Sequence, residues 1–265
     1  MIKEQLWSRV SQADSTCFRT DGDGTPMWRD LLASAPISGF VLLDIAELPA
    51  LLDFLEVNQD KLCSGYFSYD LGMALQGLTS RHTRQVPLAI IHAYDQWVEY
   101  HQGQPNYVGF NQPDSVIEEP DMDSSASIEF ISTISEASYE STIARIHEYI
   151  RAGDFYQLNF TQQLLGKTSD PISYASILKK HPAAYAMAMD CDELKITSLS
   201  PELFLHHADG ILTTEPIKGT RPRGATQQED DAHRQELMSS EKEQAELFMI
   251  TDLLRNDLGK VSEIG

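Results

Sequence analysis

The sequence predicts a protein that mixes helices and β-strands, and three observations favour this class. Apolar and alternating segments typical of strands occur between residues 40 and 103 and again between residues 185 and 217. Helical repeats of apolar residues precede Gly153 and occupy the segment from Asp230 to Leu258. The composition, with 42% hydrophobic and 23% charged residues, is that of a globular protein with a sizeable core.

The region 1–110 is predicted to be an α/β unit. Its segment 40–57, FVLLDIAELPALLDFLEV, begins as an apolar strand and continues after Pro49 as an amphipathic helix. Three leucines are expected on the apolar face of this helix: Leu51, Leu52 and Leu55. The segment 65–72, GYFSYDLG, indicates a buried strand, and the β-branched and aromatic segment 87–103 indicates either one long strand or two strands linked by a bend.

An acidic stretch follows this region. Residues 114–140 contain eight acidic residues and no lysine or arginine, and large apolar residues are sparse at their start. We therefore expect residues 111–127 to be a solvated linker or long loop and residues 128–265 to form a second region.

The second region is expected to begin with a helix and to continue as sheet. The helix ends at Gly153, and its apolar residues are spaced by four, three and four positions: Tyr139, Ile143, Ile146 and Ile150. The alternation in FYQLNFTQQLL, 155–165, indicates a strand with one polar face. Three further short strands are expected in YAMAMD, LKITSLS and GILTTEPIKGT, with a tight hairpin turn at Asp209-Gly210.

The C-terminal segment from Asp230 to Leu258 is predicted to be helical, because Leu247, Ile250 and Leu254 recur at i, i+3 and i+7. The formal net charge of −20 keeps a protein soluble and disfavours nucleic-acid binding. The N-terminus lacks the apolar stretch of a signal peptide, and no segment is long enough to span a bilayer. A cytoplasmic protein without a membrane partner is the resulting expectation.

The segment EPIKGTRPRG, Glu215 to Gly224, is the first candidate for chemistry. Lys218 follows a predicted strand, and Gly219-Thr220 is a turn that allows backbone N–H groups to approach an anion. Arg221 and Arg223 suit the binding of a carboxylate. A cationic neighbourhood and partial burial lower a lysine's pKa and so favour the free amine of a nucleophile. Composition alone favours the alternative, a surface lysine whose charge reaches water.

Acidic side chains form the second set of candidates. Glu202, in SLSPELF, follows one strand of the hairpin that delivers Lys218, where it could transfer a proton or pair with an arginine. Glu243 and Glu246 lie three positions apart on one helix face and offer the hard oxygen ligands that suit Mg²⁺. On spacing alone, solvated helical acids remain the alternative.

Five segments in order resemble the motifs of the chorismate-utilising enzymes: GYFSYDLG, IHEYIRAGDFYQLNFTQ, SLSPELF, EPIKGTRPRG and EKEQAELFMITDLLRNDLGKV. This family includes anthranilate, aminodeoxychorismate, isochorismate and salicylate synthases. The resemblance implies an α+β fold in which two antiparallel-rich β-sheets pack together, with helices outside and the active site in the cleft between them. Anthranilate synthases typically carry a small residue where this chain has Lys218, and lysine there is characteristic of aminodeoxychorismate synthase component I.

The resemblance also implies roles for single residues. Lys218 would attack C2 of chorismate with loss of the C4 hydroxyl, and ammonia would then displace the lysine by adding at C4. Glu202 would protonate the departing hydroxyl, Glu243 and Glu246 would help to hold Mg²⁺ against the chorismate carboxylate, and Gly219 and Thr220 would line the pocket around the ring. Because no G-x-C-x-G nucleophile motif occurs, the ammonia is expected from a separate glutamine amidotransferase subunit, for 4-aminobenzoate and folate synthesis.

Family members continue beyond the point that matches LRNDLGKVSEIG, so we expect this sequence to be C-terminally truncated, with a sheet face and half of the active site left open. Two other functions stay open. Anthranilate synthase component I would aminate C2 and release pyruvate, and a non-catalytic fragment of the family would bind chorismate or a subunit without turnover.

Overall fold

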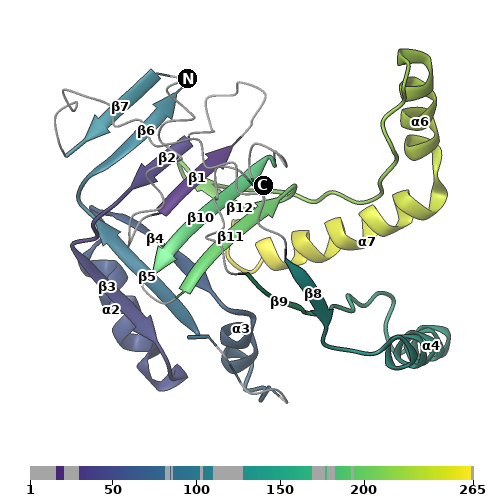
Figure 1. Cartoon of the computed structure of the whole chain (residues 1–265), viewed down its shortest axis with the longest axis horizontal. Coiled ribbons are helices and arrows are strands. Elements are labelled where there is room, and N and C mark those ends of the chain that lie inside the picture. The colour runs from purple at the N-terminus through teal and green to yellow at the C-terminus, as the bar shows by residue number, and fades with distance from the viewer. Residues whose placement is uncertain are drawn as a thin grey trace. The chain divides into compact units, whose positions relative to one another are not determined.

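The structure is a computed structural model that describes residues 16–20, 30–80, 84, 86–101, 104–109, 128–168, 177, 183–191 and 194–263 (Figure 1). The predicted linker 111–127 lies outside these residues. The chain divides into two compact units, a smaller one of Pro120–Ser176 and a larger one that combines Met1–Glu119 with Ile177–Gly265.

The larger unit contains a six-stranded antiparallel sheet with the order β11-β10-β1-β2-β6-β7. Its strands are β1 Thr16–Thr20, β2 Asp30–Ala33, β6 Trp97–His101, β7 Gln104–Val108, β10 Tyr185–Cys191 and β11 Leu194–Ser200. The strand β1 lies inside this sheet, since Phe18 pairs with Met187 of β10 on one side and with Leu31 of β2 on the other (Figure 1).

A second, three-stranded antiparallel sheet has the order β3-β5-β4, with β3 Ser38–Leu42, β4 Leu62–Phe67 and β5 Ala89–Tyr94. Residues 87–103 were predicted to form either one long strand or two strands linked by a bend. The second prediction is correct, and the two strands, β5 and β6, belong to different sheets. All six residues of β5 are buried, because both faces of this central strand are covered.

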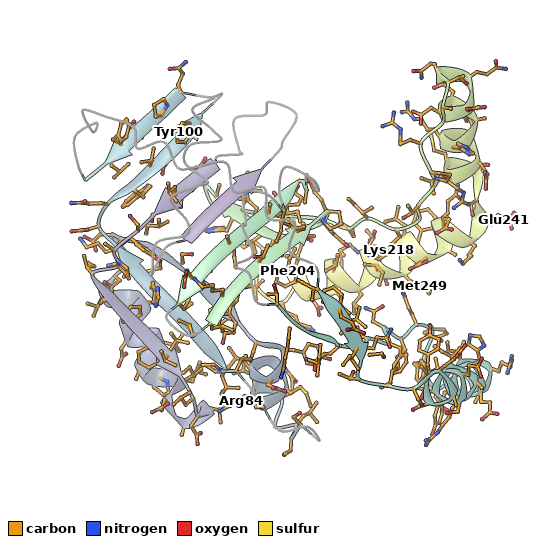
Figure 2. All side chains as sticks on the ribbon, in the orientation of Figure 1. Arg84, Tyr100, Phe204, Lys218, Glu241 and Met249 are labelled. Carbon is orange, nitrogen blue, oxygen red and sulfur yellow. The ribbon has the colours of Figure 1, made fainter. Side chains whose placement is uncertain are left out.

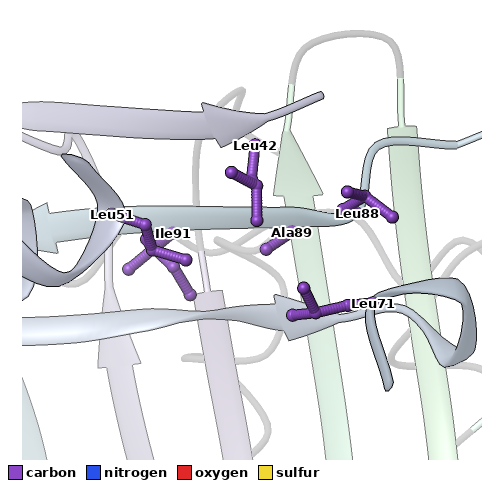
Figure 3. Packing of buried hydrophobic residues seen from close by; sticks show 6 residues of the cluster. All are labelled: Leu42, Leu51, Leu71, Leu88, Ala89 and Ile91. Atoms are coloured by element: carbon purple, nitrogen blue, oxygen red, sulfur yellow. The ribbon is translucent and has the colours of Figure 1, made fainter. Parts of the chain in front are cut away.

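One face of β5 packs against helices and the other against the six-stranded sheet. Figure 3 shows the first cluster, in which Ala89 and Ile91 of β5 meet Leu42, Leu88, Leu51 of α2 (Leu48–Val57) and Leu71 of α3 (Tyr69–Leu75). On the opposite face Ile90 packs with Met189 and Cys191 of β10. The predicted class, α+β with two packed antiparallel-rich sheets and outer helices, is therefore confirmed.

Two local predictions for this region need correction. Leu51 is 1% exposed, but Leu52 is 57% exposed, so the apolar face of α2 runs from Leu51 to the half-buried Leu55 one turn later and excludes Leu52. Only the first part of GYFSYDLG is strand. The side chain of Ser68 accepts a hydrogen bond from the N–H of Leu71 and caps α3, which turns the rest of the segment into a helix.

In the smaller unit, β8 Glu129–Ser132 pairs with β9 Leu164–Lys167, and α4 Glu136–Ala152 lies between them in the chain. As predicted, α4 ends at Gly153, which has φ 81° and caps the helix in the left-handed conformation. The prediction of a strand from 155 was wrong, because the described residues 155–163 form no ladder and β9 begins only at Leu164.

The site-bearing part of the larger unit is the hairpin of β12 Leu203–Ala208 and β13 Ile211–Glu215, followed by α6 Gln227–Ser239 and α7 Glu241–Leu258. Asp209 and Gly210 form its turn with φ 50° and 77°, the positive values that a two-residue hairpin turn requires. The single predicted helix 230–258 is two helices, because Ser240 ends α6 and caps α7.

The same part of the chain exposes large apolar side chains. Phe204 of β12 is 81% exposed and Met249 of α7 is 43% exposed (Figure 2). Among the described residues, no helix combines the length and the apolar content that crossing a bilayer requires.

Candidate active site

The open end of the β12–β13 hairpin brings Glu202 and Lys218 together. Glu202 immediately precedes β12 instead of following a hairpin strand as predicted, because LKITSLS is β11 and pairs with β10, while the hairpin partner of β13 is β12. Lys218 follows β13, and the pairing of Leu203 with Glu215 aligns the two strands at this end. Lys218 Nζ lies 3.2 Å from Oε1 and 3.5 Å from Oε2 of Glu202. Lys218 is found on the segment that connects the hairpin to α6 (Figure 2).

Both partners are held by further hydrogen bonds. Glu202 Oε1 also accepts from the backbone N–H of Ile217 at 3.1 Å, and Lys218 Nζ also donates to the Ile217 carbonyl at 2.8 Å. The backbone of Glu202 exchanges two hydrogen bonds with the hydroxyl of Ser200. The Lys218 side chain is 20% exposed and that of Glu202 is 36% exposed, so water screens this ion pair less than one on an open surface.

Tyr185 of β10 supports the strand that leads to Lys218. Its hydroxyl donates to Oε2 of Glu215, the last residue of β13, at 3.0 Å. Burial, and then the hydrogen bond to the Glu215 carboxylate, raise the pKa of the Tyr185 phenol above its usual value. Tyr185 is therefore the protonated donor at neutral pH, and this bond ties β13 to the six-stranded sheet.

Gly219 allows the chain to pass close to α7. Its φ is 79°, a conformation that L side chains rarely adopt, and a Cβ at this position would lie 2.8 Å from Leu237 Cδ1 and 2.9 Å from Glu243 Oε2. The next residue, Thr220, is exposed, and its carbonyl accepts from Nη1 of Arg221 at 2.8 Å. The turn after Lys218 thus lies directly against Glu243.

Glu243 and Glu246 lie one turn apart near the start of α7. Glu243 is 14% exposed, and its Oε1 accepts from Arg221 Nη1 at 3.4 Å. Among the described residues, no group of three or more His, Cys, Asp or Glu is arranged to hold a metal ion. Two carboxylates still fit Mg²⁺ in donor type, since this ion keeps several waters and takes one or two protein carboxylates. A cation at Glu243 would compete with Arg221 for the carboxylate.

The two arginines that seemed suited to a ligand carboxylate instead bind carboxylates of this chain. Arg221 Nε donates to Glu236 Oε1 of α6 at 2.8 Å, and Arg223 forms a two-point bond to Asp230, with N···O distances of 2.7 Å and 2.8 Å. Sequence reasoning missed Glu236 and Asp230. The pattern TQQE at 226–229 was the available signal, because it forms the capping box that starts α6 and so places Asp230 beside the loop.

The arrangement can move one proton between a base and an acid. When Nζ of Lys218 transfers a proton to Glu202, the products are a free amine and a carboxylic acid a hydrogen bond apart. The amine is a nucleophile and the acid can protonate a leaving group. One pair of side chains can therefore supply both the nucleophile of a substitution and the acid that protonates its leaving group.

Comparisons with known proteins agree with the family resemblance of the sequence motifs. A family model described as chorismate binding enzyme matches residues 40–265. An anthranilate synthase component 1 of Haloarcula marismortui is 41% identical over 138 residues, which are 51% of this chain and 27% of that protein. Aminodeoxychorismate synthase component 1 of Bacillus subtilis is 36% identical over 138 residues, 51% of this chain and 29% of that protein.

The fold has a close counterpart among solved structures. Anthranilate synthase component I of Streptococcus pneumoniae superimposes with a TM-score of 0.73 at 23% sequence identity, over 91% of this chain and 64% of that chain. At this identity the likeness concerns the fold alone. The matched segments span less than a third of the two sequence relatives and about two thirds of the structural one.

Proposed function

Because the chain belongs to the chorismate binding enzymes, the family whose model matches residues 40–265, we propose that it acts as aminodeoxychorismate synthase component I. The observation that carries the proposal is the pairing of Lys218 Nζ with Glu202 at 3.2 Å. The family resemblance adds that lysine at this position of the P-I-x-G-T motif is characteristic of aminodeoxychorismate synthases, whereas anthranilate synthases typically carry a small residue there. The product, 4-amino-4-deoxychorismate, would feed 4-aminobenzoate and folate synthesis.

The proposed reaction begins with the transfer of the ammonium proton of Lys218 to Glu202. The free amine attacks C2 of chorismate, both ring double bonds shift by one position, and the C4 oxygen leaves as water after Glu202 protonates it. Ammonia then adds at C4, both double bonds shift back, and Lys218 leaves from C2 as the amine. The net change replaces the C4 hydroxyl by an amino group and releases one water.

Glu243 and Glu246 are the residues that would hold Mg²⁺, which would neutralise the carboxylate charge of chorismate and orient it. The backbone at Gly219 and Thr220 would lie beside the substrate ring, since it follows Lys218 directly and no side chain at Gly219 intervenes. The partner that supplies ammonia would be a separate glutamine amidotransferase subunit.

Intact-mass spectrometry after incubation with chorismate and Mg²⁺, without ammonia, tests the proposal. We expect a mass gain equal to chorismate minus water, mapped to Lys218 and absent in Lys218→Ala. Lys260→Ala is the matched control. The Lys260 side chain is 66% exposed and pairs with Asp257 at 2.9 Å, so its removal should leave the adduct unchanged. An adduct that persists in Lys218→Ala would exclude this lysine as the nucleophile.

Anthranilate synthesis is the second candidate, and the 41% identity to a protein of that name is the observation that favours it. The two functions differ in their products, because anthranilate formation releases pyruvate and needs no lysine adduct. Pyruvate release from chorismate and ammonia, without an adduct on Lys218, would replace the first proposal by the second. Neither adduct nor product, with chorismate bound, would indicate a non-catalytic member of the family.

A further inference from the structure

Two carboxylates hold the loop that carries Lys218. Glu202 holds its start, and Asp230 of α6 holds its end. This residue, in the first turn of α6, accepts from Arg223 Nε at 2.7 Å, from Arg223 Nη2 at 2.8 Å and from the backbone N–H of Gly224 at 2.9 Å. A two-point arginine–carboxylate pair fixes orientation as well as distance. Asp230 therefore holds a side chain and the adjacent backbone of the loop at the same time.

The loop backbone lies directly on this turn of α6. A Cβ on Gly224 would be 2.2 Å from the backbone N of Asp230 and 2.7 Å from the carbonyl carbon of Glu229, which leaves no room for a side chain. The next two residues are held as well, because the Glu229 carboxylate accepts from the N–H groups of Ala225 at 2.9 Å and Thr226 at 3.2 Å. The end of the loop is thus fixed to α6 over consecutive residues.

Between Lys218 and this anchor the chain has little freedom. Pro222 has a fixed φ, and Arg221 is bonded to Glu236 at 2.8 Å and to the Thr220 carbonyl at 2.8 Å. Because the segment is short and restrained, its attachment at Gly224 limits the positions that Lys218 can take.

We propose that Asp230 is a positioning residue for Lys218, acting through Arg223 and Gly224 to keep the lysine amine against Glu202. The inference rests on the proposed role of Lys218 as the nucleophile and adds to it a residue that lies outside the reacting groups. Asp231 shows the contrast, since this next residue of α6 accepts from Gln227 Nε2 at 3.0 Å within its own helix.

Charge supports the same assignment. The hydrogen bonds from Arg223, and then from the backbone of Gly224, lower the pKa of the Asp230 carboxyl to about 2. The anchor is therefore fully ionised at any pH at which an amine nucleophile would work. His233 of the same helix adds a further lowering contribution.

The test compares the reactivity of lysines in the full chain, without chorismate. The protein is treated with limiting acetic anhydride between pH 7 and pH 10, and acetylation of Lys218 relative to Lys260 is measured by peptide mass spectrometry. In Asp230→Asn we expect the ratio to rise roughly three- to tenfold, the scale of one net hydrogen bond, and its pH profile to change. In the control Asp231→Asn both should match the unchanged protein.

An unchanged ratio in a folded Asp230→Asn variant would overturn the proposal, and so would an equal rise in Asp231→Asn. If Asp230→Asn does not fold, Arg223→Gln removes the side-chain pair but leaves the bond from Gly224 to Asp230. A smaller rise in the same direction supports the proposal, and no rise in folded Arg223→Gln overturns it. Failure of the proposed function gives a different result. The acetylation ratio would still rise in Asp230→Asn, but neither the unchanged protein nor any variant would form the chorismate adduct.

Discussion

Glu202 Oε1 accepts hydrogen bonds from both Nζ of Lys218, at 3.2 Å, and the backbone N–H of Ile217, at 3.1 Å. A single carboxylate oxygen therefore fixes the amine and the backbone that carries it. Glu202 is thus a structural anchor, and a substitution can distinguish this role from its proposed role as a proton carrier.

Glu202→Gln should keep the anchor and lose the proton carrier. An amide oxygen can still accept from Ile217, but the side chain can no longer take up a proton from Lys218 or return one to a leaving group. We expect the rate of adduct formation with chorismate to fall by about 10²–10⁴-fold with little change in the melting temperature. Stopped incubations followed by intact-mass analysis give the rate, and an unaltered rate would remove Glu202 from the proposed chemistry.

Gly219→Ala should destabilise the protein more than Gly210→Ala, although the two glycines have nearly the same φ, 79° and 77°. At Gly210 nothing lies within 4 Å of the added Cβ, so only the left-handed backbone conformation is penalised, by about 1–2 kcal/mol. At Gly219 the Cβ also meets Leu237 and Glu243, which adds about 1–3 kcal/mol of overpacking. Urea unfolding of both variants measures the difference. Equal losses would show that Gly219 is not tightly enclosed.

Asp230 should make stability depend on acid pH. Its folded-state pKa of about 2 lies below the ordinary 3.8, so its contribution is fully present above pH 3.8 and is lost as the pH falls through about 2. The difference in unfolding free energy between the protein and Asp230→Asn should be constant near neutral pH and shrink over that acid window. Denaturant titrations from pH 7 downward measure it, and a difference that grows toward acid would contradict the assignment.

Mg²⁺ binding should depend on α7. Glu243→Gln and Glu246→Gln should each weaken binding, measured by titration calorimetry, by roughly tenfold or more, since even outer partners of a metal site contribute on this scale. Glu241→Gln, an exposed acid in the first turn of the same helix, is the control and should bind as before. Equal weakening in all three variants would indicate a general charge effect rather than a site.

Leu51→Ala should cost about 2–5 kcal/mol of unfolding free energy, because this side chain is 1% exposed within the cluster on β5. Leu52→Ala, one position along α2 at 57% exposure, should change the free energy by less than about 0.5 kcal/mol. Thermal unfolding of the two variants side by side checks the contrast, and similar losses would place Leu52 in the core after all.

Local signals in the sequence predicted the elements that are determined locally. Gly153 marks the end of α4, and Asp209-Gly210 marks the turn that brings Glu202 and Lys218 to the same end of a hairpin. These predictions succeeded because a left-handed glycine and a two-residue turn depend on a few adjacent residues. The break between α6 and α7 also has a local cause, the cap at Ser240, but a continuous apolar repeat concealed it.

Other features depend on partners that are distant in sequence. Residues 155–163 alternate as a strand does, yet a strand also needs a neighbour for its backbone, and the ladder with β8 starts only at Leu164. The ion pairs of Arg221 and Arg223 could not be assigned from sequence, because any of 40 acidic residues was an available partner. Periodicity also could not show that β5 and β6, separated by a short bend, enter different sheets.

The pairing of β1 with β10 has a consequence for how the chain is made. Thr16–Thr20 leave the ribosome far ahead of their partner Tyr185–Cys191, so β1 must wait for most of the chain while one side of its backbone has no strand to bond. An unpaired strand flank of this kind is where growing chains associate with one another. We therefore expect growing chains to be prone to associate until Tyr185–Cys191 is made, and refolding to be slowed by this long-range closure.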